Sequence, residues 1–137
     1  MSIELRLEKL RQRMEKDDLE GVLISNSENR RYLSGFAGSA GYLLITQKNA
    51  FLATDFRYVE QAKKECLGFE IVRIAEGYSV LTSCISDLKL NSIGFEPNHI
   101  SFLDHQRLRS ELPTVIDLHP IQGIVEEIRA KKDQEEI

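Results

Sequence analysis

The sequence predicts a layered α/β domain built around a mixed β-sheet. Segments whose apolar residues recur at helical spacing alternate with short apolar runs along most of the 137 residues. Two of these runs, Tyr42 to Thr46 and Ala50 to Thr54, are joined by only three residues and are typical of an antiparallel hairpin. Because alternating helices and strands usually pair their strands in parallel, we expect mostly parallel neighbours together with this one antiparallel pair.

The first half of the chain begins with an expected amphipathic helix whose N-terminus Ser2 can cap. Its apolar residues are spaced by four, three and four positions, as one helix face requires: Ile3, Leu7, Leu10 and Met14. The continuous apolar run of residues 21–25 predicts a strand that is buried on both faces. Residues 27–33 are expected to form one or two helical turns before a glycine-rich loop that leads into the hairpin.

The second half continues the alternation. We expect helices at 56–65 and 79–88 and strands at 69–75 and 93–96, with Gly77 breaking the chain between the first strand and its helix. Ser101 and Asp104, three residues apart, predict a capped helix that continues to about Leu112. After Pro113 we expect a last strand at 115–118 and a closing helix. The apolar face of that helix comprises Ile121, Ile124, Val125 and Ile128.

Length and composition predict a single domain and argue against several classes of protein. The length is sufficient for one hydrophobic core, and no repeat or Pro/Gly-rich linker divides the chain. A net charge of -4 and a pI near 5.4 argue against a nucleic-acid partner. No apolar run approaches the roughly 20 residues that cross a bilayer, and the charged N-terminus is unlike an export signal. We therefore expect a cytoplasmic protein without a membrane partner, whose Cys66 and Cys84 are reduced thiols.

The stretch from Asn29 to Tyr58 is where we expect the function, because it contains a loop with Gly35, Gly38 and Gly41. Glycine permits positive φ and close approach to the backbone, so three of them predict a shaped loop. It is not a phosphate loop, since no Gly-Lys-Ser/Thr follows and the chain continues into a strand. A structural connection and a loop facing a substrate or an interface both stay open. The glycine spacing disfavours a nucleotide-binding α/β domain.

The residues after the hairpin supply the clearest candidate side chains. Asp55 stands between a strand and a helix and is expected to be an N-cap. The planar guanidinium of Arg57 suits a carboxylate, and Asp55 or Glu60 nearby is favoured over that of a ligand. No catalytic constellation is expected, because neither cysteine has an obvious base and the histidines are scattered over three elements. They are His99, His105 and His119.

The C-terminus allows two interpretations. Asp133 and Glu136 stand three residues apart, as at the start of a new helix. Ile137 is the first apolar residue after Ala130, however, so such a helix would have no apolar face to bury. A frayed, charged tail is the alternative.

Three motifs resemble, in order and spacing, those of the N-terminal domain of the creatinase/prolidase/Xaa-Pro aminopeptidase family of metallopeptidases. They are Asn29-x-x-Tyr32-Leu33-Ser34-Gly35-Phe36-x-Gly38-Ser39, Thr54-Asp55-x-Arg57-Tyr58-x-x-Gln61-Ala62 and Ile93-Gly94-Phe95-Glu96. The last ten residues, from Ile128, are similar to the family's junction into its catalytic domain. The resemblance covers essentially the whole chain. One departure is Phe56, at a position where relatives commonly have glycine.

The resemblance implies a three-layer α/β/α sandwich of ribonuclease-H-like topology. It places the domain at residues 1–128 and the junction with the truncated start of a catalytic domain at 129–137. The implied parent hydrolyses the bond before proline with two divalent metal ions, Mn, Co or Zn, bound by Asp, His and Glu residues of the later domain. The resemblance therefore implies no catalytic residue, metal ligand or cofactor in this chain.

The same resemblance implies a role as a non-catalytic domain that closes one wall of the substrate channel and supports dimers or tetramers. Its partners would be its own catalytic domain, a neighbouring subunit and proline-containing peptides. The residues expected at that channel or interface are Arg57, Tyr32, Phe36, Asp55 and Tyr58. Two alternatives stay open: a peptide- or protein-binding module of a metal-free, chaperone-like relative, and a domain of a creatinase-type amidinohydrolase.

Overall fold

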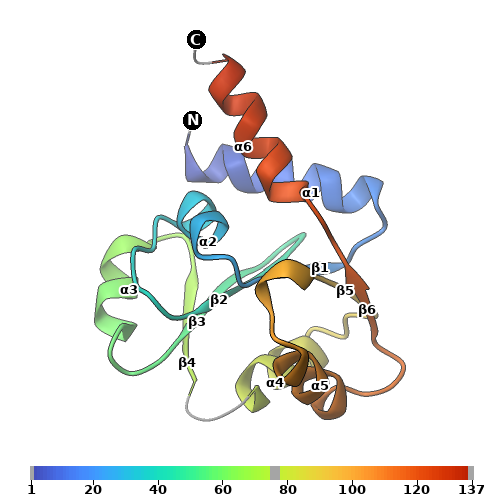
Figure 1. Cartoon of the computed structure of the whole chain (residues 1–137). Helices are drawn as coiled ribbons and strands as arrows, with labels where there is room; N and C mark the ends of the chain where they lie inside the picture. The colour runs from blue at the N-terminus through green and yellow to red at the C-terminus, as the bar shows by residue number, and fades with distance from the viewer. Residues whose placement is uncertain (1, 75–77, 136–137) are drawn as a thin grey trace.

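The computed structural model describes residues 2–74 and 78–135, with side chains in the last helix up to Lys131. Within these residues six strands form one sheet, and helices cover both of its faces (Figure 1). The helices are α1 (Ile3–Lys16), α2 (Ser27–Ser34), α3 (Val59–Glu65), α4 (Ser79–Asp87), α5 (Phe102–Glu111) and α6 (Ile124–Glu135), with a 3-10 turn at Pro97–His99. The strands are β1 (Gly21–Ile24), β2 (Tyr42–Thr46), β3 (Ala50–Thr54), β4 (Glu70–Arg73), β5 (Ser92–Phe95) and β6 (Asp117–Pro120).

The described strands lie in the order β4-β3-β2-β1-β5-β6, and β2 alone among them runs opposite to the rest. The predicted hairpin of β2 and β3 is confirmed, but β2 also pairs antiparallel with β1, with Leu23 opposite Leu44. The chain leaves β1 at its carboxyl end, passes through α2 and the glycine loop, and enters β2 from the same end. Because this connection does not cross the sheet, β2 must run antiparallel to β1.

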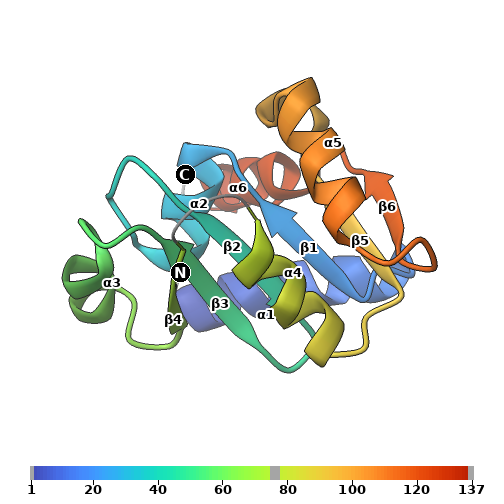
Figure 2. The same ribbon diagram turned by 90° about the horizontal axis from the view of Figure 1, so that it is seen from below.

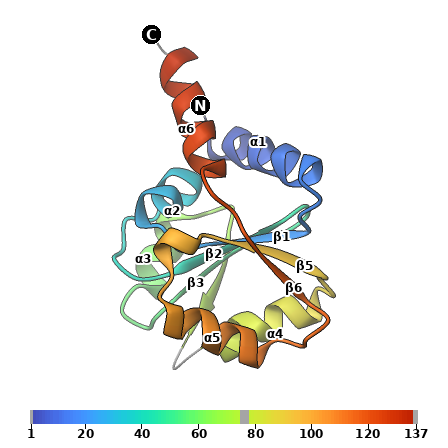
Figure 3. The same ribbon diagram turned by 45° about the vertical axis from the view of Figure 1, so that its right-hand side comes forward.

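Successive residues of the central strands point to opposite faces and enter two separate cores. Val22 and Ile24 of β1 pack on the side of α1, α2 and α6, whereas Leu23 packs with residues of α4 and α5. The views from below and from the side show the same two layers of helices, one on each face of the sheet (Figures 2 and 3). The expected three-layer α/β/α sandwich with a mixed sheet is confirmed.

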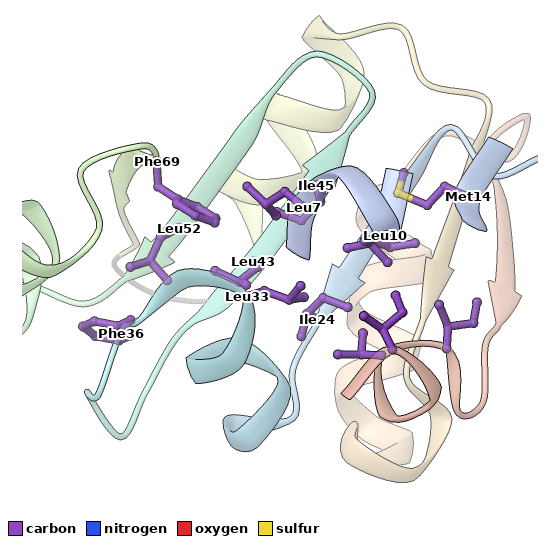
Figure 4. Packing of buried hydrophobic residues seen from close by; sticks show 14 of the residues in the cluster. Leu7, Leu10, Met14, Ile24, Leu33, Phe36, Leu43, Ile45, Leu52 and Phe69 are labelled. Carbon is purple, nitrogen blue, oxygen red and sulfur yellow. The ribbon is translucent and has the colours of Figure 1, made fainter. Parts of the chain in front are cut away.

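The larger core lies between α1 and the sheet (Figure 4). Leu10 and Met14 of α1 are fully buried, and Leu7 beside them is 7% exposed. They pack in one cluster with strand residues that include Ile24 and Ile45. The predicted helical spacing therefore identified the buried face of α1, and the predicted cap is also present, since Ser2 accepts the amide hydrogen of Leu5.

The last strand begins at Asp117 and not at Val115 as predicted. The guanidinium of Arg109 donates to the carbonyl oxygens of Pro113 and Ile116, at 2.6 Å each, and holds residues 113–116 in a turn. Those carbonyl groups are thereby withheld from the strand ladder. Val115 is consequently 79% exposed, while Ile116 enters the core beside α5.

The helix expected from Phe56 begins at Val59, and Asp55 is not its N-cap. The Asp55 carboxylate instead accepts the backbone hydrogen of Arg57 at 3.0 Å, and the Asp55 carbonyl accepts that of Tyr58. Residues 55–58 therefore form a turn between β3 and α3, in which Phe56 is 69% exposed.

The last helix, α6, continues without a break from Ile124 to Glu135, so Asp133 lies within it and does not begin a new helix. The division between residues 1–128 and 129–137 stays a prediction. Glu136 and Ile137 lie outside the described residues, as do Gly77 and the end of the strand expected at 69–75. Among the described helices none is both long and apolar enough to cross a membrane.

Candidate functional site

The glycine loop, residues 35–41, and the turn at 55–58 meet at one end of the sheet, where β3 ends and β2 begins. Thr54 Oγ1 at the end of β3 donates to the carbonyl oxygen of Ala40 at 2.6 Å. Ser39 Oγ and Tyr58 Oη lie 2.6 Å apart and share a hydrogen bond. The two segments, separated in sequence by the hairpin, therefore form one surface.

Arg30 of α2 holds the loop from inside. It is only 3% exposed, and its two terminal nitrogens donate to the carbonyl oxygens of Gly38 and Gly41, at 2.9 Å each. Burial lowers the pKa of Arg30, since the charged form is costly away from water. The role of Arg30 could not be predicted from the sequence, because nothing in the local pattern separates it from its exposed neighbour Arg31.

Phe36 is a core residue that supports the loop from beneath. It is 1% exposed and belongs to the cluster under α1, so it does not itself present a surface in this chain. Its ring explains Gly38, because a Cβ atom at that position would lie 2.2 Å from Phe36 Cζ. Gly35 has a different reason: it ends α2 with a φ of 80°, which other residues rarely adopt.

Tyr58 and Tyr32, both half-buried, lie on different sides of the loop. The ring of Tyr58 meets that of Phe36 edge-on with centroids 6.0 Å apart. Tyr32 faces α1, where the guanidinium of Arg6 stacks 4.3 Å from its ring centroid and donates to its carbonyl oxygen at 2.7 Å. The structure therefore brings Tyr58 together with Asp55 and Arg57, whereas Tyr32 contacts Arg6 of the first helix.

Asp55 and Arg57 form the expected local ion pair. Arg57 Nε lies 3.1 Å from Asp55 Oδ1 and Nη2 lies 2.7 Å from Oδ2, a two-pronged geometry. The hydrogen bond from Arg57 holds the pKa of the Asp55 carboxyl below its ordinary value. The Arg57 side chain is 58% exposed and lies 5.1 Å from the Tyr58 ring centroid. Its guanidinium is therefore accessible to a further anionic group.

A hollow of about 280 Å³ opens beside this surface, between the glycine loop, Asp55 and the start of α5. Arg30 and Asp55 line one part of it, and Asp104 lines another. Tyr42 on its wall shares a 2.9 Å hydrogen bond with buried Tyr78, and burial is the main reason that the pKa of Tyr78 is raised. The hollow thus combines both signs of charge.

The histidines are separated, as the sequence predicted. His99 Nε2 lies 2.9 Å from Asn26 Nδ2, His105 packs against the ring of Phe95, and His119 pairs with Asp117 on the edge strand. Among the described residues no group of three or more His, Cys, Asp and Glu side chains could hold a metal ion.

Comparison with known proteins gives concordant results. Residues 6–131 match the family model described as the creatinase/prolidase N-terminal domain. An uncharacterized peptidase of Bacillus subtilis (strain 168), YqhT, is 35% identical over an alignment of 136 residues that covers 97% of this chain and 38% of that protein.

Two solved structures show the same fold. The Xaa-Pro dipeptidase from Bacillus anthracis has a TM-score of 0.87 and 32% identity, over 93% of this chain and 36% of that chain. The N-terminal domain of the cytoplasmic peptidase PepQ from Mycobacterium tuberculosis H37Rv has a TM-score of 0.85 and 31% identity, over 91% of this chain and 98% of that one. The chain thus spans little more than a third of YqhT and of the dipeptidase, and nearly all of the isolated domain.

Proposed function

The chain belongs to the creatinase/prolidase N-terminal domain family, and on that basis we propose that it is the non-catalytic N-terminal domain of a Xaa-Pro peptidase of aminopeptidase or dipeptidase type. Its role is to close one wall of the substrate channel and to support the assembly of subunits. The observation that carries the proposal is the exposed side chain of Arg57 in the turn that meets the glycine loop. A side chain in that position can meet a carboxylate of a substrate or of a neighbouring subunit.

The Arg57 guanidinium is suited to such a contact because it is already oriented. The Asp55 carboxylate and the Tyr58 ring hold it against the turn, so less side-chain freedom is lost when a second anion binds. The rest of the wall is rigid, because Arg30 and Phe36 secure the loop from within. A rigid wall favours short peptides, since a long chain could not pass it.

The chemistry belongs to a second domain in this proposal. Two divalent metal ions, Mn, Co or Zn, would be bound there and would supply the activation needed for hydrolysis of the bond before proline. The described residues of this chain include no side-chain group that fits a metal ion, so we assign it no metal-dependent step. The partners are that catalytic domain, a neighbouring subunit in a dimer or tetramer, and proline-containing peptides. A cytoplasmic location is part of the proposal and is supported by the description of PepQ.

The proposal is tested first on the 137-residue chain itself, by measuring metal content and Xaa-Pro peptide hydrolysis with Mn²⁺ supplied. No turnover is expected. Activity that survives purification and stops when a chelator is added would contradict a non-catalytic role.

The role of Arg57 is tested in a protein that carries this domain ahead of a metallopeptidase domain. Because a lost charge-assisted contact to substrate weakens transition-state binding, Arg57→Ala should lower kcat/KM for Xaa-Pro peptides about tenfold. The matched control is Arg107→Ala, which removes an exposed arginine of α5 and should leave kcat/KM unchanged. Equal activity and equal assembly of both variants would show that Arg57 is structural only.

A further inference from the structure

A second polar cluster joins three of the segments singled out in the sequence, and the proposed function does not use it. Asn29 of α2 is fully buried, and its amide nitrogen donates to Glu96 Oε2 at 2.7 Å and also to Glu126 Oε1. Its amide oxygen accepts a hydrogen bond from Arg129 Nη1 at 2.9 Å. We call these four residues, Asn29, Glu96, Glu126 and Arg129, the Asn29 junction. It connects α2, the end of β5 and α6.

The side of the junction that belongs to the sheet is firmly held. Glu96, which is 6% exposed, follows β5 directly, and its Oε1 accepts the backbone hydrogens of Ser25 and Asn26 at 2.7 and 2.8 Å. Both carboxylate oxygens are therefore satisfied, by groups at the end of β1 and the start of α2. The hydrogen bonds of Glu96 therefore fix the position of the Asn29 amide without any contribution from α6.

Among the side chains of α6 that the structure describes, up to Lys131, the buried apolar residues are Ile124, Val125 and Ile128. These residues fix the position of the start of α6. Polar contacts on two sides of the helix then constrain its angle to the sheet. On one side Arg13 of α1 pairs with Glu127, with side chains 33% and 57% exposed, and such exposed pairs contribute little. On the other side lies the Asn29 junction, in which Asn29 and Glu96 are buried, Arg129 is half-buried and Glu126 is exposed.

We propose that the Asn29 junction determines the direction of α6 relative to the sheet. The second half of α6 extends beyond the sandwich (Figures 1 and 3), so a small change of angle at its base displaces its far end. In a longer protein of the proposed kind the junction would orient the domain that follows, and this consequence rests on the proposed function. The direction of α6 itself does not depend on that function.

The chemistry of asparagine suits this role. Glu126 and Arg129 stand three residues apart on one face of α6, and the first needs a hydrogen-bond donor while the second needs an acceptor. A side-chain amide offers both, in one plane. Aspartate has nearly the same shape but no donor, and at position 29 it would face two carboxylates. Asn29→Asp therefore replaces the hydrogen bonds to Glu96 and Glu126 by repulsion between carboxylates, while it keeps an acceptor for Arg129 and the volume of the site.

The experiment measures the distance between spin labels on the 137-residue chain, one at Lys131→Cys on α6 and one at Arg107→Cys on α5, in a Cys84→Ser background. Both labelled positions are exposed, and Cys66 is left in place because it is buried. The unmodified junction should give one narrow distance distribution. Asn29→Asp and Arg129→Met should lose that single narrow distance, because α6 samples several angles.

The matched control is Arg13→Met, which breaks the exposed lateral pair of α6 and should keep the narrow distribution. Far-UV circular dichroism establishes that each variant is folded. If Asn29→Asp does not fold, Arg129→Met decides the question, since the Arg129 side chain is 32% exposed and contributes little to the core. A folded Arg129→Met variant that keeps the narrow distance would overturn the proposal. No peptidase activity is measured, so the outcome is independent of the proposed function.

Discussion

Arg30 binds the glycine loop from within, whereas Arg57 lies in the turn at 55–58 that meets this loop, and the two arginines differ in burial and in partners. Arg30 is 3% exposed and donates to two backbone carbonyl oxygens, whereas the Arg57 side chain is 58% exposed and pairs with one carboxylate. If a buried guanidinium moved away, the carbonyl oxygens that it binds would lose their hydrogen-bond donors, which is costly. An exposed one can exchange Asp55 for another anion at little cost. Arg30 therefore maintains the shape of the loop, whereas Arg57 is accessible to another anion.

The largest effect on stability is expected at Arg30, the buried arginine. Arg30→Met should lower the free energy of unfolding by roughly 3 kcal/mol, because two loop carbonyl groups lose their donors in a site shielded from water. Urea denaturation measures this loss. The control is Arg31→Met, which changes the exposed neighbour and should stay within about 0.5 kcal/mol of the unmodified chain. Equal stability of the two variants would mean that water replaces Arg30 and that the comparison fails.

A second substitution tests how tightly the loop packs on the core at the contact between Gly38 and the Phe36 ring. Gly38→Ala should cost about 2 kcal/mol, because its new methyl group must displace the Phe36 ring. Gly68→Ala is the matched control, since a Cβ atom at Gly68 meets nothing within 4 Å, and it should be nearly neutral. Adding Phe36→Leu to Gly38→Ala should recover part of the loss if the two residues are coupled. Strict additivity of the two changes would argue against a steric cause.

A smaller effect is expected at the hydrogen bond that ties the loop to β3. Thr54 is fully buried, and Thr54→Val removes its 2.6 Å hydrogen bond to the Ala40 carbonyl oxygen while keeping the shape of the side chain. The expected cost is about 1 kcal/mol. Hydrogen exchange of the loop amides should accelerate in the variant. Unchanged exchange would show that Arg30 alone maintains the loop.

The smallest effect on stability is expected at Arg57, the exposed arginine. Arg57→Ala should lower the urea midpoint only slightly at pH 7, because the pair is exposed, and should raise the pKa of Asp55 toward its ordinary value, as carboxyl NMR resonances can show. Since the pKa of Asp55 is lowered in the folded chain, its contribution to stability is present above its unfolded pKa. That contribution disappears as the pH falls through its folded pKa. Any difference in stability between the unmodified chain and Arg57→Ala should therefore vanish in acid. A difference that persists in acid would have another cause.

Several elements could be predicted from local pattern because one face of each is buried. The spacing of Leu7, Leu10 and Met14 identified the inner face of α1, and the run at 21–25 identified a strand that faces two cores. Boundaries were predicted less well wherever a polar side chain binds the backbone of the adjacent turn. Arg109 delays the start of β6, and the Asp55 side chain delays the start of α3.

The candidate site was predictable to a lesser extent. The local pairing of Arg57 with Asp55 follows from their separation of two residues, and the structure confirms it. The burial of Phe36 and its contact with Gly38 could not be foreseen, because the loop has no periodicity. The Asn29 junction joins residues up to a hundred positions apart in sequence, and no local pattern connects them.

The motif order and the hydrophobic periodicity were sufficient for the class of fold, the order of most elements and the family. They were sufficient because burial of apolar side chains depends on spacing along the chain, which can be read locally. The tertiary structure alone decided that β2 pairs with β1, that Arg30 is buried while Arg31 is exposed, and that Asn29 meets α6. Polar side chains find their partners through the packing of distant elements, and their energies depend on the burial which that packing creates.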